Sequence, residues 1–321
     1  MTYTSGGQIM ATDYNGFVST TAGANVNDVW ATGASDKGWG QSALATVSAT
    51  NTVTATQWAS LVNTIASMGS QTGTTITART APTAGTTISV LAAVNTDLTN
   101  VTTNRNNAAA VGTQYTGWTG TNSKTATTSG ASWTITFTNT VTFASAAAAR
   151  YFFNAGGLIK LLTEKSSTGN TGDPEWNDLA TTLCGDIYFS GVAASHTIAG
   201  VAYTGTTKIG GTGTPTTLST ATGFYALTPG AAATIIYKQF ADTAPYTSNF
   251  IQHSVALNAG STALTFTTLW SASDGDPITG GTAASGATPG TAPCTICTYF
   301  PPSTTYLSNS WGTPTVAATT A

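Results

Sequence analysis

Apolar residues in the first 110 positions recur at the three- and four-residue spacing of amphipathic helices. In TVTATQWASLVNTIASMGSQ this spacing predicts a helix that begins at Thr54 or Thr56 and ends at Gly69, with an apolar face made by Trp58, Leu61, Val62, Ile65 and Met68. A second helix is expected within residues 85–110, with Asp97 on its polar face. Residues 12–30 are expected to supply a shorter helix pair capped by Thr12.

Strand and helix patterns alternate in the next part of the chain. ASWTITFTN, residues 131–139, alternates apolar and polar side chains strictly, which predicts a half-buried strand. The next segment is AAAARYFFNAGGLIKLL. Its paired glycine is consistent either with a functional glycine loop or with a simple turn from a helix to a strand. We expect the turn, with a helix over 146–153 capped by Ser145, a stop at Gly156 and Gly157, and LIKLL as a strand. DPEWNDLATTL should form another helix, before the strand DIYFSGV, with its apolar residues inward: Trp176, Leu179, Ala180 and Leu183.

Strand-like runs separated by glycine and proline residues make up the last third of the chain. Strands are expected at GFYAL, ATIIYKQF, SNFIQHSVAL and ALTFTTLW, then a loose segment after Ser271, a last strand over 295–300 and a C-terminal tail. The expected fold class is therefore α+β and β-rich, with an antiparallel sheet or sandwich. Three regions result: a helix-rich docking or assembly region over 1–120, a mixed α/β region over 121–202, and a β-rich region with an extended tail over 203–321.

Charge is scarce, and this narrows the classes of partner. Only 7% of the 321 residues are charged and the net charge is −3, so no basic surface for nucleic acid is expected. No run approaches the ~18 apolar residues of a membrane span, and the N-terminus lacks the pattern of an export signal. Interface cores are depleted of charged residues, so this composition suits a surface that neighbouring subunits cover.

Cysteine, histidine and glycine motifs give weak signals for chemistry. Cys294 and Cys297 form a CTIC pair far from Cys184, and buried or idle thiols are favoured over a local disulfide or a metal site. His196 and His253 lie in strand-like runs with no evident nucleophile beside them. GTTKIGGTGTP, residues 205–215, does not match a phosphate-binding loop, because the lysine precedes the paired glycines and no helix follows, so a β-turn or an exposed loop is favoured.

Acidic and aromatic residues provide the remaining candidates. Glu175 and Asp178 share a helix face, and a place in the first helical turn explains them without catalysis. Asp274 and Asp276 in SDGDP are favoured as a turn, with calcium binding or an acid pair for glycan cleavage as alternatives. Tyr237 and Trp270 are candidates for contact with host glycans, although core packing is the favoured role for each. No catalytic residue, cofactor or enzymatic activity is assigned.

Several motifs together resemble a group of structural proteins of tailed bacteriophages, especially phages of aquatic bacteria. The resemblance covers residues 8–190 and rests on QIMATDYNGFV, VWATGASDKGWGQSAL, VTATQWASLVNTI, FASAAAARYFFNAGGLIKL and DPEWNDL, while YLSNSWGTPTV is similar to the ends of such chains. ARYFFNAGG and GWGQ are its most specific elements. The family implies a tail-fibre-like or other virion protein and offers no catalytic residue.

The expected function is thus a structural part of a phage virion, made in the host cytoplasm without a signal peptide. A tail, fibre or baseplate position is favoured, and a head decoration or cement protein is the first alternative. A host-surface glycan-binding adhesin or depolymerase is the second. The expected partners are further copies of the chain, with a trimer as one arrangement, other virion proteins and, for the second alternative, host polysaccharide.

Overall fold

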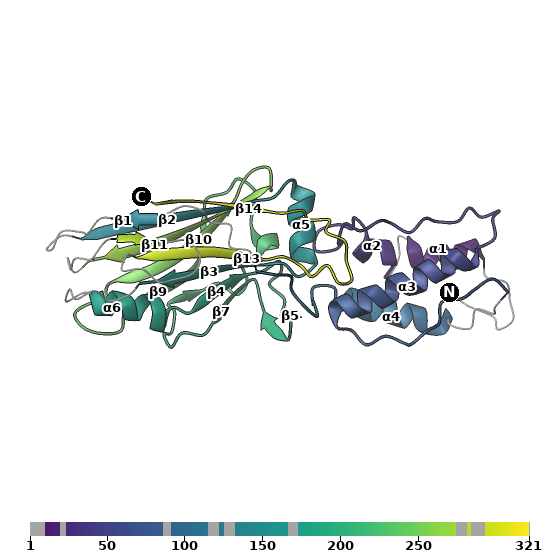
Figure 1. Ribbon diagram of the computed structural model, residues 1–321, viewed down its shortest axis with the longest axis horizontal. Helices are drawn as coiled ribbons and strands as arrows, with labels where there is room; N and C mark the ends of the chain where they lie inside the picture. The colour runs from purple at the N-terminus through teal and green to yellow at the C-terminus, as the bar shows by residue number, and fades with distance from the viewer. Residues whose placement is uncertain are drawn as a thin grey trace.

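The chain forms two lobes arranged end to end. The computed structural model describes residues 10–19, 24–85, 91–114, 122–124, 132–165, 173–273, 281–283 and 293–320. Helices occupy one end of the elongated molecule and sheets the other (Figure 1). We call the described part of 10–114 the helical lobe and the described part of 122–320 the sandwich lobe.

The helical lobe contains four helices: α1 (Ala11–Val18), α2 (Val26–Trp30), α3 (Ala55–Thr72) and α4 (Leu91–Thr103). The expected start of α3 is confirmed, because Thr54 and Gln57 form a reciprocal capping box. The expected stop at Gly69 is wrong. The helix continues to Gly73, whose φ of 66° provides the left-handed cap, and Ile76 packs against Gly69 inside the helix. Helix α1 starts after Met10 rather than at Thr12.

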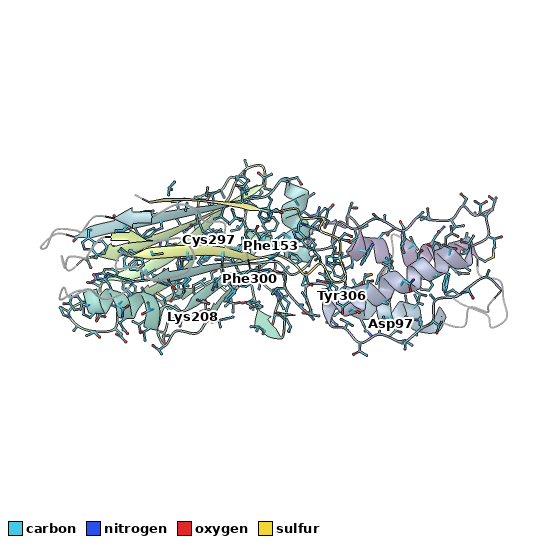
Figure 2. All side chains as sticks on the ribbon, viewed as in Figure 1. Asp97, Phe153, Lys208, Cys297, Phe300 and Tyr306 are labelled. Atoms are coloured by element: carbon cyan, nitrogen blue, oxygen red, sulfur yellow. The ribbon has the colours of Figure 1, made fainter. Side chains whose placement is uncertain are left out.

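Aromatic packing and one ion pair hold these helices together. The rings of Tyr14 and Phe17 lie 6.0 and 6.1 Å from that of Trp58 on α3. Asp97 lies in the helical lobe, on α4 (Figure 2). It was expected at the surface, yet only 3% of it is exposed. Its carboxylate pairs with Arg79 and accepts hydrogen bonds from the Thr77 amide, which holds the extended segment after α3 against α4. This partner explains how a charged side chain is buried there.

Two antiparallel sheets make the sandwich lobe. The larger has the strand order β14-β2-β11-β10-β9-β8. Its strands are β2 (Trp133–Thr142), β8 (Thr217–Leu218), β9 (Thr234–Phe240), β10 (Phe250–Leu257), β11 (Ala263–Ala272) and β14 (Thr315–Thr320). The smaller has the order β13-β3-β4-β7, with β3 (Leu158–Glu164), β4 (Asp186–Phe189), β7 (Thr206–Ile209) and β13 (Cys294–Phe300). Both sheets contribute to one core, where the ring centroids of Phe189 and Phe266 are 5.4 Å apart.

Short helices close the space between the sheets. Helix α5 (Ala146–Asn154) lies at the end that faces the helical lobe, and α6 (Asp173–Asn177) lies toward the other end (Figure 1). Helix α6 runs into a π-helical turn, η1 (Asp178–Leu183), which the sequence pattern did not predict. The expected apolar face is nevertheless buried. The ring centroid of Trp176 lies 4.9 Å from that of Trp133 and 5.7 Å from that of Trp270.

Two small ribbons and one turn complete the lobe. Strand β1 (Asn122–Lys124) pairs with β12 (Gly281–Ala283), and β5 (His196–Ile198) pairs with β6 (Val201–Tyr203). The expected strand GFYAL is wrong, because η2 (Phe224–Ala226) is a 3-10 turn. The amides of Phe224 and Tyr225 bond to the carbonyls of Ser190 and Gly191, just beyond β4, and the Phe224 ring stacks on Phe153 at 4.7 Å.

The α+β, β-rich fold class is confirmed, but the division at residue 202 is not a structural boundary. The larger sheet joins β2 with strands from beyond residue 203, and the smaller joins β3 and β4 with β7 and β13. Residues 121–202 and 203–321 therefore build one interlocked lobe. The expected C-terminal tail is also corrected, since Thr315–Thr320 forms β14 and pairs with β2.

The turn from α5 to β3 matches the expectation closely. Ser145 accepts a hydrogen bond from the Ala148 amide at the start of α5, and Gly156 has a φ of 95° after its end. A Cβ on Gly157 would lie 2.5 Å from the Phe152 ring. The paired glycine therefore serves a left-handed turn and a close approach of backbone to a core aromatic ring.

Gly157→Ala is predicted to destabilise the protein by about 1–3 kcal/mol, because the added methyl group overlaps the Phe152 ring. Gly260→Ala is the matched control, since its Cβ would meet nothing closer than 3.6 Å, and we expect a change below about 1 kcal/mol. Urea unfolding followed by tryptophan fluorescence measures both. Equal midpoints for Gly157→Ala and the unsubstituted protein would contradict the packing described here.

Candidate functional site at the junction of the lobes

A loop of the helical lobe turns its backbone carbonyls toward the sandwich lobe. Residues 32–40 have the sequence TGASDKGWG and follow α2. Four of these residues have left-handed backbone conformations: Gly33, Ser35, Gly38 and Gly40. A Cβ on Gly33 or Gly38 would overlap backbone atoms of the same loop, and one on Gly40 would overlap the Tyr151 ring of α5. Glycine is therefore required for this loop to close and to approach α5.

Two polar side chains of α5 meet these carbonyls. Arg150 and Asn154 are four residues apart, so they lie on the same face of the helix. The Arg150 guanidinium donates to the carbonyls of Thr32, Gly33, Ser35 and Lys37 at 3.2–3.3 Å. Asn154 Nδ2 donates to those of Ser35, Lys37 and Gly38 at 2.8–3.2 Å. We call loop 32–40 with Arg150 and Asn154 the junction clamp.

Aromatic side chains complete the junction clamp from both lobes. Trp39 Nε1 donates to the Asn154 carbonyl at 2.9 Å. The Tyr225 hydroxyl lies 2.8 Å from the Ser35 carbonyl and 2.6 Å from Asn154 Oδ1. Burial raises the pKa of Tyr225 to about 12, so its hydroxyl stays protonated at neutral pH. Asn154 therefore has its amide nitrogen, its amide oxygen and its main-chain carbonyl bonded at a position that is only 1% exposed.

The C-terminal part of the chain crosses the same junction. Gln41 and Ser308 exchange two hydrogen bonds, from the Gln41 amide to the Ser308 carbonyl and from the Ser308 amide to Gln41 Oε1. The Gly112 amide donates to the Pro301 carbonyl at 2.7 Å and so also joins the two lobes. Gln71 at the end of α3 donates to the Ala155 carbonyl at 3.0 Å. Segments from the start, middle and end of the chain thus meet at one place.

The polar groups of this site bind one another and so hold parts of the chain in position. A guanidinium that is free to bind an anion presents its donors in a planar fork, whereas the donors of Arg150 point at carbonyls of the same chain. Buried, mutually satisfied polar groups fix a unique geometry, because any shift leaves a donor or carbonyl without its partner. The junction clamp therefore holds the lobes in one relative orientation.

Tyr237 and Trp270, the candidates for glycan contact, are both fully buried in the sandwich core. Tyr237 donates to the Cys184 carbonyl at 3.0 Å, and Trp270 packs on Trp176 and Phe137. Glycan contact is therefore wrong for both residues, and core packing is their role. An inward position on β9 or β11 follows from strand alternation once the register is fixed.

Asp274 and Asp276 lie outside the described residues. The other acidic candidates, Glu175 and Asp178, come together with Asp242, which the sequence analysis did not connect with them. Their closest oxygens all lie within 4.8 Å of one another, and this is the one such group of acidic, histidine or cysteine ligands in the described ranges. Three single oxygens fall short of the six to eight that Ca²⁺ takes. Burial, Asp178 and Asp242 raise the pKa of Glu175.

The thiols and histidines are enclosed by the fold. Cys184, Cys294 and Cys297 are all buried and free, and burial raises the pKa of Cys297 to about 12, so its thiol stays protonated. His253 bonds to Thr268 Oγ1 at 2.8 Å, and burial lowers its pKa to about 3. Lys208 donates to the carbonyls of Gly211 and Gly213, so the lysine of the segment 205–215 is hydrogen-bonded to the glycines of that same segment.

The sequence contained a signal for the junction clamp that its pattern analysis did not use. Arg150 and Asn154 are two polar residues at helical spacing on a helix otherwise made of alanine and aromatic residues. The contact partners lie more than 110 residues away, and backbone carbonyls leave no mark in a sequence. None of the helices in the described ranges is both long and apolar enough to cross a bilayer.

Asn154→Ala is predicted to destabilise the protein by about 2–4 kcal/mol, because it removes three hydrogen bonds to loop 32–40, leaves the buried Gly38 carbonyl without its side-chain donor, and removes one of the two acceptors beside the Tyr225 hydroxyl. Limited trypsin digestion should then cut after Lys37 faster than in the unsubstituted protein. Asn51→Ala, at an exposed position, is the control and should change stability by no more than about 0.5 kcal/mol. Unchanged stability and unchanged cleavage for Asn154→Ala would contradict the junction clamp.

Glu175→Gln is predicted to raise the thermal midpoint at neutral pH and to leave it unchanged below pH 4. The raised pKa means that the folded state binds this proton more tightly than the unfolded state, so stability falls as pH rises through that pKa. Glutamine stays uncharged at every pH, so this loss of stability does not occur, and its side-chain oxygen still accepts the hydrogen bond from the Thr243 backbone. Scanning calorimetry from acidic to neutral pH measures the effect.

Asp242→Asn tests the same repulsion, because its effect and that of Glu175→Gln should be less than additive. A midpoint for Glu175→Gln that follows the unsubstituted protein at every pH would contradict the repulsion.

The chain matches no protein-family model, no curated protein and no solved structure.

Proposed function

We propose that this chain is a structural subunit of a tailed-phage virion, placed in the tail, fibre or baseplate, and that it acts through assembly rather than catalysis. The observation that carries the proposal is the junction clamp, which joins a helical lobe and a sandwich lobe end to end through bonds to Arg150 and Asn154. A subunit that positions other proteins needs such a fixed shape.

The resemblance to phage structural proteins supports the proposal through the same residues. ARYFFNAGG supplies both polar side chains of the junction clamp, and GWGQ supplies Gly38, Trp39, Gly40 and Gln41. The two most specific elements of the resemblance therefore build the junction. A shared architecture accounts for them without any catalytic role.

On the outer face of the larger sheet, the uncharged side chains of β2 and β11 support assembly. Thr136, Thr138 and Thr140 of β2 lie beside Leu269, Thr267 and Thr265 of β11 on the half-buried face that points away from the core. Another subunit can cover such a face without desolvating an ion, which would be costly. The proposed partners are further copies of the chain and other virion proteins, with the helical lobe as the docking end.

Gold-labelled antibody raised against the purified chain is predicted to bind the tail or its appendages in negative-stain electron micrographs of virions. Particles produced without this chain are the control and should carry no label. Label spread over the capsid would replace the tail position with the head decoration alternative. Particles that carry no label at all, although the same antibody detects the chain in infected cells, would contradict the virion proposal.

A further inference from the structure

A polar pocket of about 320 Å³ lies beside the junction clamp. Its walls come from loop 32–40, from the residues that follow α4, and from the segment that leads into β5. Figure 1 shows β5 in the part of the sandwich lobe nearest the helical lobe. The residues that matter for its chemistry are Asp36, Arg105, Asn106, Asn107, Ser195 and His196. Pockets between structural units are common places for ligands, and this volume is at the small end of their range.

Hydrogen bonds across the pocket fix its walls. The Ala108 amide donates to the Thr197 carbonyl at 2.9 Å, and the Ala199 amide donates to the Ala108 carbonyl at 2.8 Å. The Thr197 amide also donates to Asn107 Oδ1 at 2.8 Å. Arg105, which also lines the pocket, pairs with Asp36 and donates to the Thr102 carbonyl. A ligand would therefore meet a preorganised site and lose little affinity to ordering.

Several polar groups on these walls have hydrogen-bonding capacity to spare among the residues that the structure describes. The Asn106 amide makes no side-chain hydrogen bond there, and Asn107 uses its oxygen but not its nitrogen. His196 is 6% exposed, and its Nδ1 lies 2.8 Å from the Ala194 carbonyl. A carbonyl only accepts, so Nδ1 carries the proton and Nε2 is left as an acceptor. Burial lowers the pKa of His196, which keeps the ring neutral.

The charge balance of the pocket selects the class of ligand. Arg105 is paired with Asp36, so the described walls carry no net positive charge to favour an anionic group, while Arg105 Nε has no partner among the described residues and adds one more donor. Asp36 is the one carboxylate on the walls, which is too few for a metal ion. The lining contains no phenylalanine, tyrosine or tryptophan against which a nucleobase would stack. What remains is a dense set of neutral donors and acceptors, and these match the adjacent hydroxyl groups of a sugar.

We propose that this junction pocket binds a neutral saccharide residue through Asn106, Asn107 and His196. The site goes beyond the proposed assembly role and does not depend on it. An isolated chain that binds no sugar would overturn the site and leave the virion proposal standing, and absence from the virion would do the reverse.

The test is saturation-transfer-difference NMR on the full chain with methyl glycosides of glucose, galactose, mannose and N-acetylglucosamine at millimolar concentration. We expect transfer to at least one of them. Asn106→Ala should weaken binding of that glycoside roughly two- to tenfold, the equivalent of one lost hydrogen bond. Ala194→Trp, which fills the pocket from an exposed position, should abolish the signal.

Asn63→Ala is the matched control, because Asn63 is exposed on α3 and does not line the pocket. It should bind like the unsubstituted chain, and circular dichroism should show all variants folded. No transfer to any glycoside, or transfer that survives Ala194→Trp, would overturn the proposal. Glucuronate bound as tightly as the neutral sugars would overturn the assigned ligand class.

Discussion

Backbone carbonyls held by two side chains of one short helix determine how this molecule is put together. Seven hydrogen bonds from Arg150 and Asn154 reach the carbonyls of loop 32–40. Carbonyls that are enclosed without a donor cost free energy, so the loop and helix α5 stabilise each other only in this arrangement. The C-terminal segment is bonded to the end of this loop through Ser310, which donates to the Trp39 carbonyl at 2.5 Å, and to the next residue through the Gln41–Ser308 pair.

Helix α5 also links this junction to the sandwich core. Phe153 lies on the same helix as Arg150 and Asn154, stacks on Phe224, and contacts Phe189 of the smaller sheet. Helix α5 therefore fixes the position of the sheets relative to the helical lobe. A charge-poor molecule whose lobes are joined in this way suits the assembly role that we propose, and the polar pocket beside the junction is the place where we propose that a neutral sugar binds.

Local patterns in the sequence predicted most elements, while long-range partners decided the rest. Ser145, Gly156 and the alternation in β2 gave their elements correctly, because caps, left-handed turns and period-two burial are local properties. Gly69 failed as a stop because the left-handed cap of α3 is at Gly73, and the tail after residue 314 became β14 because it pairs with the edge of β2. Asp97, the junction clamp and the Glu175–Asp178–Asp242 group all depend on contacts between distant segments, which one sequence does not encode locally.

Differential scanning calorimetry of the purified chain tests the central claim that the junction makes the two lobes one structural unit. We predict a single heat-absorption peak whose calorimetric and van't Hoff enthalpies agree, because neither lobe can unfold without breaking bonds to Arg150, Asn154 and Gln41. Two separate peaks, with the helical lobe melting while the sandwich lobe remains folded, would contradict it.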